Sequence, residues 1–333
     1  MPQIALTGIK PTGTPHIGNY LGAVLPGLAL ARQPDTRAYY FIADYHALTG
    51  THDRQQLLHD TYEVAAFWLA FGLDPDEVVF YRQSDVPEVF ELSWILACFT
   101  PKGFMNKAHA YKAKVDVNVA AGEPDDAGVG MGLYTYPVLM AADILVVDAD
   151  VVPVGKDQIQ HVEIARDIAQ RINHLYGEGT LHLPSAHVRE QTAIVPGLDG
   201  RKMSKSYGNT IPCFLPSKKL RKMVMKIKSD STPPEEPKDP DSSLVFQMHR
   251  ALLDADAEAA LAAEYRAGIS WGGAKQLLFE EIERHVAEPR ERYEALMADP
   301  GRLDELLAAG ADKARATTQP MLGRVREALG IAR

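Results

Sequence analysis

The chain has 333 residues, of which 46% are hydrophobic and 24% are charged, close to the average of globular domains. This composition excludes an intrinsically disordered chain and predicts two domains. No hydrophobic run reaches the ~20 residues that span a bilayer, and the first residues lack a basic segment, so we expect neither a membrane anchor nor a secretory signal. Two distant cysteines, Cys98 and Cys213, exclude a disulfide framework or a cysteine-based zinc site and favour the cytoplasm.

The net charge of −9 excludes a protein that is basic over its whole surface. One segment nevertheless carries only positive charge, because residues 201–228 contain nine lysines and arginines and no acidic residue. A run of like charge is usually a solvated face. In an acidic protein, this run also raises the alternative of a surface for a polyanion.

Strand and helix patterns alternate along the first half of the chain. Strands are predicted at 4–7, 39–43, 78–81 and 144–147, and helices at 17–31, 57–71, 89–98 and 157–175. This alternation predicts an α/β fold with a Rossmann-like parallel sheet. Ligands of such sheets bind beyond the carboxyl ends of the strands.

Beyond residue 209 only helical patterns remain. They cover 218–228, 242–254, 258–267, 273–297, 302–307 and 311–329, and a loop rich in proline and acid occupies 231–241. We therefore predict a Rossmann-like domain at 1–208 and a smaller all-α domain at 209–333. The last helix, at about 311–329, could pack back on the first domain.

The loop at 8–19, GIKPTGTPHIGN, lies between the first strand and the first helix. Glycines allow a ligand to approach the backbone closely, and the start of a helix offers unpaired N–H groups to phosphate. His16 and Asn19 are three residues apart, so they face the same side. Taken alone, this loop is equally compatible with an ordinary turn between a strand and a helix.

The segment at 200–209, GRKMSKSYGN, is the second loop with a chemical pattern. Its two lysines, Lys202 and Lys205, can place ammonium groups on a polyphosphate and stabilise the charge that develops on a leaving group. A basic surface loop is the alternative. The pentapeptide at 202–206 is too specific to favour that alternative.

These two loops resemble the HIGH and KMSKS signatures of class I aminoacyl-tRNA synthetases. The segments at 8–22, 43–49, 132–145, 152–160 and 166–169 further resemble tryptophanyl-tRNA synthetases, and the likeness covers essentially the whole chain. The resemblance implies ATP-dependent activation of L-tryptophan to tryptophanyl-adenylate, with release of pyrophosphate, and transfer to the 3′ end of tRNA(Trp). It also implies Mg²⁺ carried by ATP with no metal ligands on the protein, a homodimer, and an anticodon-binding role for the helical domain.

The resemblance implies roles for individual residues. Catalytic roles fall on Lys202, Lys205, Lys114 and His16. ATP contacts fall on Lys10, Pro11, Thr12, Gly18, Asn19, Gly155, Lys156, Asp157, Val195, Lys202, Met203, Ser204, Lys205 and Ser206. Tryptophan contacts fall on Asp143, Tyr136, Met140, Gln158, His46, Leu6, Val152 and Val154.

Asp143 is predicted to stand directly before the strand at 144–147, where it would accept the indole N–H. Tyr136 and Gln158 would hold the ammonium group of the amino acid. Simpler alternatives are a turn or cap role for Asp143, a helix N-cap role for Asp157, and a solvated position for Lys114.

Several positions depart from the common family pattern. Asn19 is the fourth residue of the HIGH-like element, Lys10 and Lys156 replace a frequent glutamine and glutamate, and Leu6 replaces a frequent aromatic residue. The segment at 115–130 is longer than in many relatives.

Two alternative functions remain. A tyrosyl-tRNA synthetase would share fold, motifs and chemistry. A non-catalytic, synthetase-like nucleotide-binding paralogue would not need both His16 and the lysines of 202–206.

Overall fold

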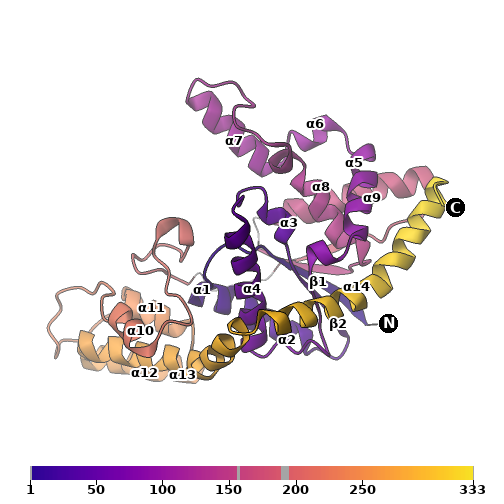
Figure 1. Ribbon diagram of the computed structural model, residues 1–333. Coiled ribbons are helices and arrows are strands. Elements are labelled where there is room, and N and C mark those ends of the chain that lie inside the picture. Colours follow the sequence, from indigo (N-terminus) through magenta and orange to yellow (C-terminus); the bar gives the residue numbers. More distant parts are fainter. Residues whose placement is uncertain (1, 156–157, 189–194, 333) are drawn as a thin grey trace.

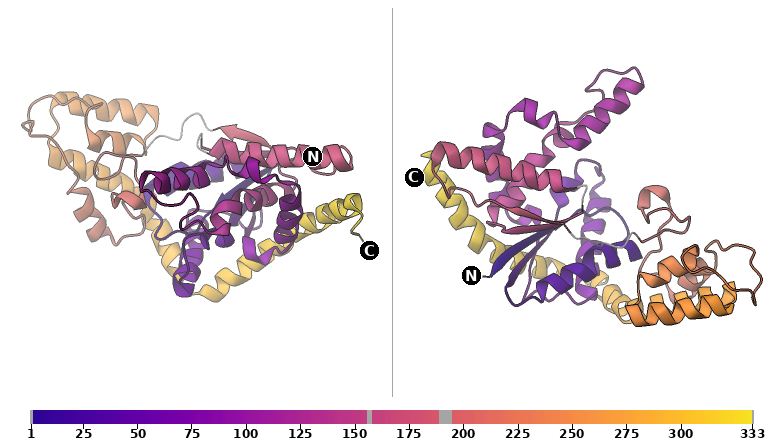
Figure 2. Two further views of the ribbon diagram at one scale, coloured as in Figure 1. Left: turned by 90° about the horizontal axis from the view of Figure 1, so that it is seen from above. Right: turned by 180° about the vertical axis from the view of Figure 1, so that it is seen from behind.

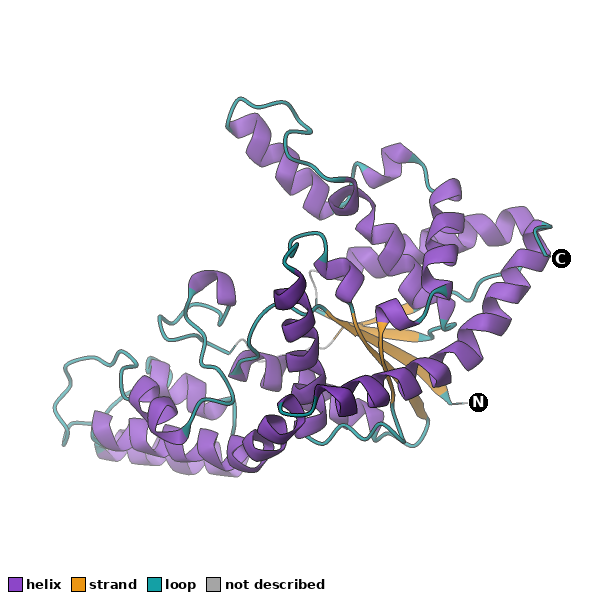
Figure 3. Cartoon of the chain, in the orientation of Figure 1, coloured by secondary structure: helices purple, strands orange, loops and turns teal. Residues whose placement is uncertain are grey.

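The computed structural model describes residues 2–155, 158–188 and 195–332 of the chain. A twisted sheet lies at the centre with helices on both faces, and a helical unit extends from one end (Figure 1; Figure 3). The last helix runs from that unit along the sheet toward the opposite end, in all three views (Figure 1; Figure 2).

The sheet has five parallel strands within the described residues, in the order β3-β2-β1-β4-β5. Their bounds are β1 (Gln3–Ile9), β2 (Thr36–Ile42), β3 (Val79–Arg82), β4 (Val151–Val154) and β5 (Ser185–Val188). The chain moves outward from β1 on one side and then returns to add β4 on the other. This reversal creates the crevice where such sheets bind ligands, and it confirms the predicted Rossmann-like α/β fold.

Helices of the first part of the chain flank this sheet, except that the two within residues 102–120 contact a neighbouring helix and project away from the sheet (Figure 1). All helices of this part follow in chain order. They are α1 (Ile17–Asn19), the π-helical segment η1 (Tyr20–Val24), α2 (Leu25–Ala31), α3 (Asp44–Ala47), α4 (Arg54–Ala70), the 3₁₀ turn η2 (Gln83–Asp85), α5 (Glu88–Phe99), α6 (Lys102–Met105), α7 (His109–Ala120), α8 (Met131–Val146) and α9 (Ile159–Tyr176). The remainder are the 3₁₀ turn η4 (Lys205–Tyr207), α10 (Ser217–Val224), α11 (Leu244–Arg250), α12 (Ala255–Ala267), α13 (Trp271–Met297) and α14 (Pro300–Leu329).

The alternation of side chains along β2 explains why two layers of helices form. Tyr39 and Phe41 pack into a core with α5, α8 and α9, whereas Tyr40 and Ile42 pack into a second core with α4. All four side chains are buried, because successive residues of a strand point to opposite faces. The second core continues into α10–α13, so the helical unit shares apolar packing with the sheet.

The predicted strand at 144–147 is wrong, because Ile144, Leu145 and Val146 form the last turn of α8 and Val147 caps it. A short apolar run that is buried on every side looks the same as a helix or a strand, and only its length distinguishes the two. The strand next to β1 is β4, which begins at Val151. Asp143 therefore lies within a helix rather than before a strand.

The two helices predicted at 302–307 and 311–329 are one continuous helix, α14. Gly310 lies within this helix and serves a contact, because a Cβ atom there would overlap the carbonyl oxygen of Phe80 in β3. The glycine lets α14 lie directly against the sheet edge. Strand β5 was not predicted, and the predicted helix at 157–175 begins at Ile159 in the described residues.

None of the helices within the described ranges is long and apolar enough to cross a bilayer.

Candidate active site

Two adjoining cavities open at the carboxyl ends of β1 and β4, at the reversal of strand order. Their volumes are about 540 Å³ and 510 Å³. Both are lined by Thr7 from β1 and by Pro153, Val154 and Gly155 from β4 and its end. We call the first the loop cavity, because two loops form much of its remaining wall. We call the second the core cavity, because side chains of the sheet and of two helices line it.

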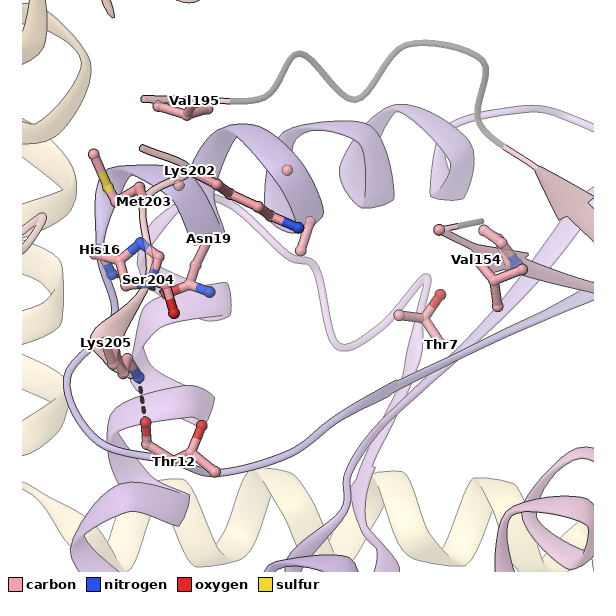
Figure 4. A pocket seen from close by; sticks show the side chains of 15 residues that line it. Thr7, Thr12, His16, Asn19, Val154, Val195, Lys202, Met203, Ser204 and Lys205 are labelled. Carbon is pink, nitrogen blue, oxygen red and sulfur yellow. Dashed lines mark hydrogen bonds between the residues drawn. The ribbon is translucent and has the colours of Figure 1, made fainter. Parts of the chain in front are cut away.

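The loop cavity is walled by the segment after β1 and by the segment at 195–205. Ten of the predicted catalytic and ATP-contacting residues line it: Thr12, His16, Gly18, Asn19, Gly155, Val195, Lys202, Met203, Ser204 and Lys205. Figure 4 shows most of these side chains around one space, with Lys202 extending into it. Two segments nearly 190 residues apart in the chain are thus brought to one cavity.

Some predicted residues lie elsewhere. Pro11 and Ser206 are not among the lining residues of the loop cavity, and Lys10 lines the core cavity. Lys114 is on α7 beside Gly128, outside the lining of both cavities. Lys156 and Asp157 lie outside the described residues.

His16 caps α1 and is held by its neighbours. Its backbone N–H donates to Asn19 Oδ1 at 3.1 Å. A Cβ atom on Gly18 would lie 3.0 Å from the ring, so a larger residue would crowd the histidine. Burial, with a further contribution from Lys205, lowers the pKa of His16 to about 4. The ring is therefore neutral at pH 7, and its buried Nδ1 has no partner among the described residues.

Asn209 organises the loop that carries the two lysines. Its Oδ1 accepts the N–H of Ser204 at 2.8 Å, while its Nδ2 donates to Asp199 Oδ1 at 2.7 Å and to the Lys202 carbonyl at 3.1 Å. Asn209 is buried, and Gly197 is pressed against its amide with no room for a side chain. The Asn209 amide and then Arg201 lower the pKa of Asp199 to about 2.

Backbone hydrogen bonds join the two loops. Ile17 N–H donates to the Ile211 carbonyl at 2.9 Å, and Cys213 N–H donates to the Pro15 carbonyl at 3.2 Å. Residues 211–213, which follow the two lysines, are thus hydrogen-bonded directly to the backbone at the start of α1.

Lys205 lines the loop cavity and links its own loop to the segment after β1. Its Nζ donates to the carbonyls of Thr12 and Gly13, the latter at 2.6 Å, and Gly13 N–H donates to Asp60 Oδ2 at 2.8 Å. Partial burial lowers the pKa of Lys205, and the carboxylates of Asp60 and Glu63 oppose this shift. The ammonium group of Lys205 is therefore held by two backbone carbonyls in a cavity that Lys202 also lines.

The core cavity is lined by side chains of the sheet and of α3 and α8. All eight predicted tryptophan-contacting residues line it: Leu6, His46, Tyr136, Met140, Asp143, Val152, Val154 and Gln158. Phe41, Ala43 and Leu133 add to its apolar walls. A cavity with mostly apolar walls and a few polar groups suits a small amphipathic ligand.

Asp143 is the charged group at the bottom of this cavity and is 2% exposed. Its Oδ2 lies 2.8 Å from His46 Nε2, and its Oδ1 accepts from Gln83 Nε2 at 2.7 Å. Burial raises the pKa of Asp143, whereas the hydrogen bonds from His46 and Gln83 oppose that rise. Each carboxylate oxygen can accept two hydrogen bonds, so Asp143 keeps acceptor capacity for a ligand.

Two further contacts define the rim of the core cavity. The hydroxyl of Tyr136 lies 2.8 Å from His161 Nε2. Lys10 Nζ donates to Thr49 Oγ1 at 3.0 Å, and burial lowers the pKa of Lys10.

The described residues contain no group of three histidine, cysteine or acidic side chains that could hold a metal ion. None of the described residues lining the loop cavity is an aspartate or glutamate. This donor set, with lysines, hydroxyls and amides, fits a polyphosphate better than a bare divalent cation.

Comparison with known proteins assigns the family. A model of the class I tRNA synthetases (W and Y) matches residues 1–287. The chain is 54% identical over 328 residues to the tryptophan–tRNA ligase of Pseudomonas aeruginosa, covering 98% of this chain and 73% of that one. The chain belongs to the class I tryptophan–tRNA ligases. The ligase of Neisseria meningitidis is 52% identical, with 98% and 97% of the two chains covered.

A solved structure from this synthetase family has the same fold. The tryptophanyl-tRNA synthetase from Campylobacter jejuni, complexed with ADP and tryptophan, superposes with a TM-score of 0.89 at 44% identity. The match covers 98% of this chain and all of the other. The resemblance to tryptophanyl-tRNA synthetases is thereby confirmed.

Three residues of this synthetase were missed from the sequence: Gln83, Asn209 and His161. A signal for Gln83 existed, because it directly follows β3 and so stands at the ligand-binding edge of the sheet. Asn209 ends the KMSKS-like segment, but nothing local indicated that its amide is buried. His161 lies on α9 and is brought to Tyr136 only by helix packing.

Proposed function

We propose that the protein activates L-tryptophan with ATP and transfers it to tRNA(Trp) for protein synthesis. In the first step, a carboxylate oxygen of tryptophan attacks the α-phosphorus of ATP, and pyrophosphate leaves. In the second step, a hydroxyl of the terminal ribose attacks the carbonyl carbon of the adenylate, and AMP leaves. The observation that carries this proposal is the pair of adjoining cavities, one ending in a buried carboxylate and one lined by two lysines.

In this proposal the core cavity binds tryptophan. Asp143 accepts the indole N–H, which a buried carboxylate can do with two other donors already in place. Leu6, Met140, Val152 and Val154 pack on the ring, and His46 fixes the carboxylate. Tyr136 and Gln158 receive the ammonium group. The end of the cavity nearest Gly155 then presents the tryptophan carboxylate to the neighbouring space.

The loop cavity would bind ATP. Lys202 extends into the cavity and is positioned for the phosphates (Figure 4). Lys205 would exchange the carbonyls of Thr12 and Gly13 for phosphate oxygens, which are better acceptors for an ammonium group. His16 is neutral and acts as a hydrogen-bonding group. Catalysis is then positioning together with charge stabilisation at the leaving pyrophosphate.

Other assigned contacts stay predictions. The ribose and phosphate contacts of Lys156 and Asp157, and the contacts of Pro11, Ser206, Lys10 and Lys114, follow from the family resemblance alone. Mg²⁺ would arrive with ATP and neutralise phosphate charge, since the described lining of the loop cavity offers it no carboxylate.

We also propose the domain boundary at 208/209, an anticodon-binding role for the helical part, a cytoplasmic location and a homodimer. Exposed apolar side chains on α5 support the homodimer. Phe90 and Trp94 are one turn apart and 43% and 74% exposed. Tyr45 of α3 contacts Phe90 edge to face, with ring centroids 4.3 Å apart.

ATP–pyrophosphate exchange with each of the twenty amino acids in turn tests the function. We expect exchange with tryptophan only. Exchange with tyrosine instead would make the protein a tyrosyl-tRNA synthetase. No exchange with any amino acid would favour a non-catalytic paralogue.

The basic run at 201–228 provides a surface for tRNA phosphates. Lys218, Lys219 and Lys222 are exposed on α10 and take part in none of the ion pairs seen among the described residues. Arg201, by contrast, is paired with Asp199. Replacing the three lysines by glutamate should weaken tRNA binding and flatten its salt dependence, because fewer counterions are released. Adenylate formation should be unchanged, and an unaltered salt slope would make this run a solvated face.

A further inference from the structure

Gln83 is a fully buried amide beneath the core cavity. It is the first residue of η2, directly after β3. Its Nε2 donates to Asp143 Oδ1 at 2.7 Å, and its Oε1 accepts the backbone N–H of Tyr45 at 3.2 Å. It lines neither the core cavity nor the loop cavity, so it can affect a ligand only through its neighbours, of which Asp143 lines the core cavity and Tyr45 lies next to the lining residue His46.

The two hydrogen bonds of Gln83 have a fixed direction. A backbone N–H can only donate, so the amide oxygen must face Tyr45 and the amide nitrogen must face Asp143. Asp143 Oδ1 is therefore met by a donor and cannot carry a proton toward Gln83 without a donor–donor clash. His46 lies against the other oxygen at 2.8 Å.

We propose that Gln83 is a positioning residue that keeps Asp143 an ionised acceptor, so that the core cavity selects an amino acid whose ring carries an N–H donor. The proposal rests on the proposed role of Asp143 toward the indole ring. Gln83 acts on Asp143 in two ways. Its hydrogen bond fixes the plane of the Asp143 carboxylate, and its donation favours the ionised form of that group.

The groups around Asp143 determine how the preference for tryptophan should depend on pH when Gln83 is replaced. The groups that face it are His46 on α3, Gln83 on η2 and Tyr81 on β3. Burial, and then the charge of Asp143, raise the pKa of Tyr81. Burial already raises the pKa of Asp143. Loss of the Gln83 donor raises it further, so Asp143 takes up a proton as the pH falls. The neutral group accepts the indole N–H more weakly, because the hydrogen bond is no longer assisted by charge.

The experiment compares tryptophan with its benzothiophene analogue, in which sulfur replaces the ring N–H. Pyrophosphate exchange gives kcat/KM for both between pH 6 and 8.5. We expect the unmodified protein to prefer tryptophan strongly at every pH, as sites do that would otherwise leave a buried polar group unpaired. In Gln83→Met, which keeps length but cannot donate, this preference should fall about 10- to 100-fold at pH 6 and recover as the pH rises. The kcat for tryptophan at saturation should stay close to its unmodified value.

Asn173→Leu is the matched control. Asn173 is a buried amide on α9 with two hydrogen bonds to the backbone of Leu181, away from both cavities. Its replacement should lower the melting temperature but leave the preference and its pH profile unaltered. If Gln83→Met folds poorly, Gln83→Glu serves instead: two buried carboxyl groups would share a proton, and the preference should again depend on pH.

The possible outcomes distinguish the role of Gln83 from the role of Asp143 on which it rests. A preference that stays complete and independent of pH in Gln83→Met overturns the role of Gln83 alone. A pH-independent loss that follows the melting temperature, as in a purely structural role, also overturns it. An unmodified protein that does not distinguish tryptophan from the sulfur analogue overturns the role of Asp143 and, with it, the proposed reading of the core cavity.

Discussion

The core cavity and the loop cavity are nearly equal in volume but are built in opposite ways. The core cavity is enclosed by β1, β4, α3 and α8, and its carboxylate is paired inside the protein with His46 and Gln83. The loop cavity is enclosed by two loops joined by a few backbone hydrogen bonds, and its lysines lie at the surface. In the proposed function, selectivity therefore falls to a cavity whose polar groups are already paired within the protein, and charge stabilisation falls to a cavity whose lysines are exposed.

This difference predicts a division of kinetic effects. Changes in the core cavity should act on the binding of one substrate, since its polar groups are oriented before the ligand arrives. Changes in the loop cavity should act on the rate, since Lys205 must leave the carbonyls of Thr12 and Gly13 to reach phosphate.

The largest expected effect is that of Asp143→Ala. The change removes the acceptor for the indole N–H and also leaves Gln83 and His46 without their partner, so kcat/KM for tryptophan should fall by roughly 10³- to 10⁴-fold. ATP affinity should stay close to normal. Asp143→Asn keeps one acceptor oxygen and should lose less. Pyrophosphate exchange, ATP titration and melting temperature on both variants check this, and a joint loss of stability and ATP binding would point to a structural role.

Lys202→Ala and Lys205→Ala should each lower the rate of adenylate formation by about 10²- to 10³-fold, the usual effect of one lost transition-state donor. Tryptophan affinity should change little. A single-turnover measurement of tryptophanyl-adenylate formation gives this rate directly, and pyrophosphate exchange checks it at steady state. If either variant exchanges at close to the unmodified rate, that lysine has no part in the reaction.

A smaller effect is expected for Asn209→Asp. The carboxylate cannot donate to Asp199 Oδ1 or to the Lys202 carbonyl, so two negative groups would face each other and loosen the loop. We expect kcat to fall about 10-fold with an unaltered tryptophan KM, and to recover as the pH falls and the pair shares a proton.

The double variant Asp199→Asn, Asn209→Asp is the control for that prediction. It exchanges the two groups and restores one donor and one acceptor. It should recover part of the lost rate, and a double variant no better than Asn209→Asp alone would show that the hydrogen bond does not matter.

The sequence predicted the Rossmann-like fold and named most of the residues that line the two cavities, but it misplaced some elements between them. The loops at 8–19 and 200–209 carry residue types that phosphate chemistry requires, so their meeting was predictable from composition and family likeness. The strand assigned to 144–147 failed because an apolar run that is buried on all sides has no visible period. The helix α14 was predicted as two helices, and nothing in the sequence shows that Gly310 packs against Phe80 within it.

Gln83 illustrates a different limit. Its importance comes from two hydrogen bonds to residues 38 and 60 positions away, and no local pattern encodes such partners. Lys114 shows the converse: the family pattern named it, whereas α7 places it outside the lining of both cavities.

Calorimetric titration tests the division between the two cavities most directly. Tryptophan without ATP, and ATP without tryptophan, are titrated into the unmodified protein, Asp143→Ala and Lys202→Ala. We predict that Asp143→Ala loses tryptophan binding and keeps ATP binding, and that Lys202→Ala keeps tryptophan binding unchanged. Loss of both ligands in either variant would contradict the account, because the two cavities would then act as one.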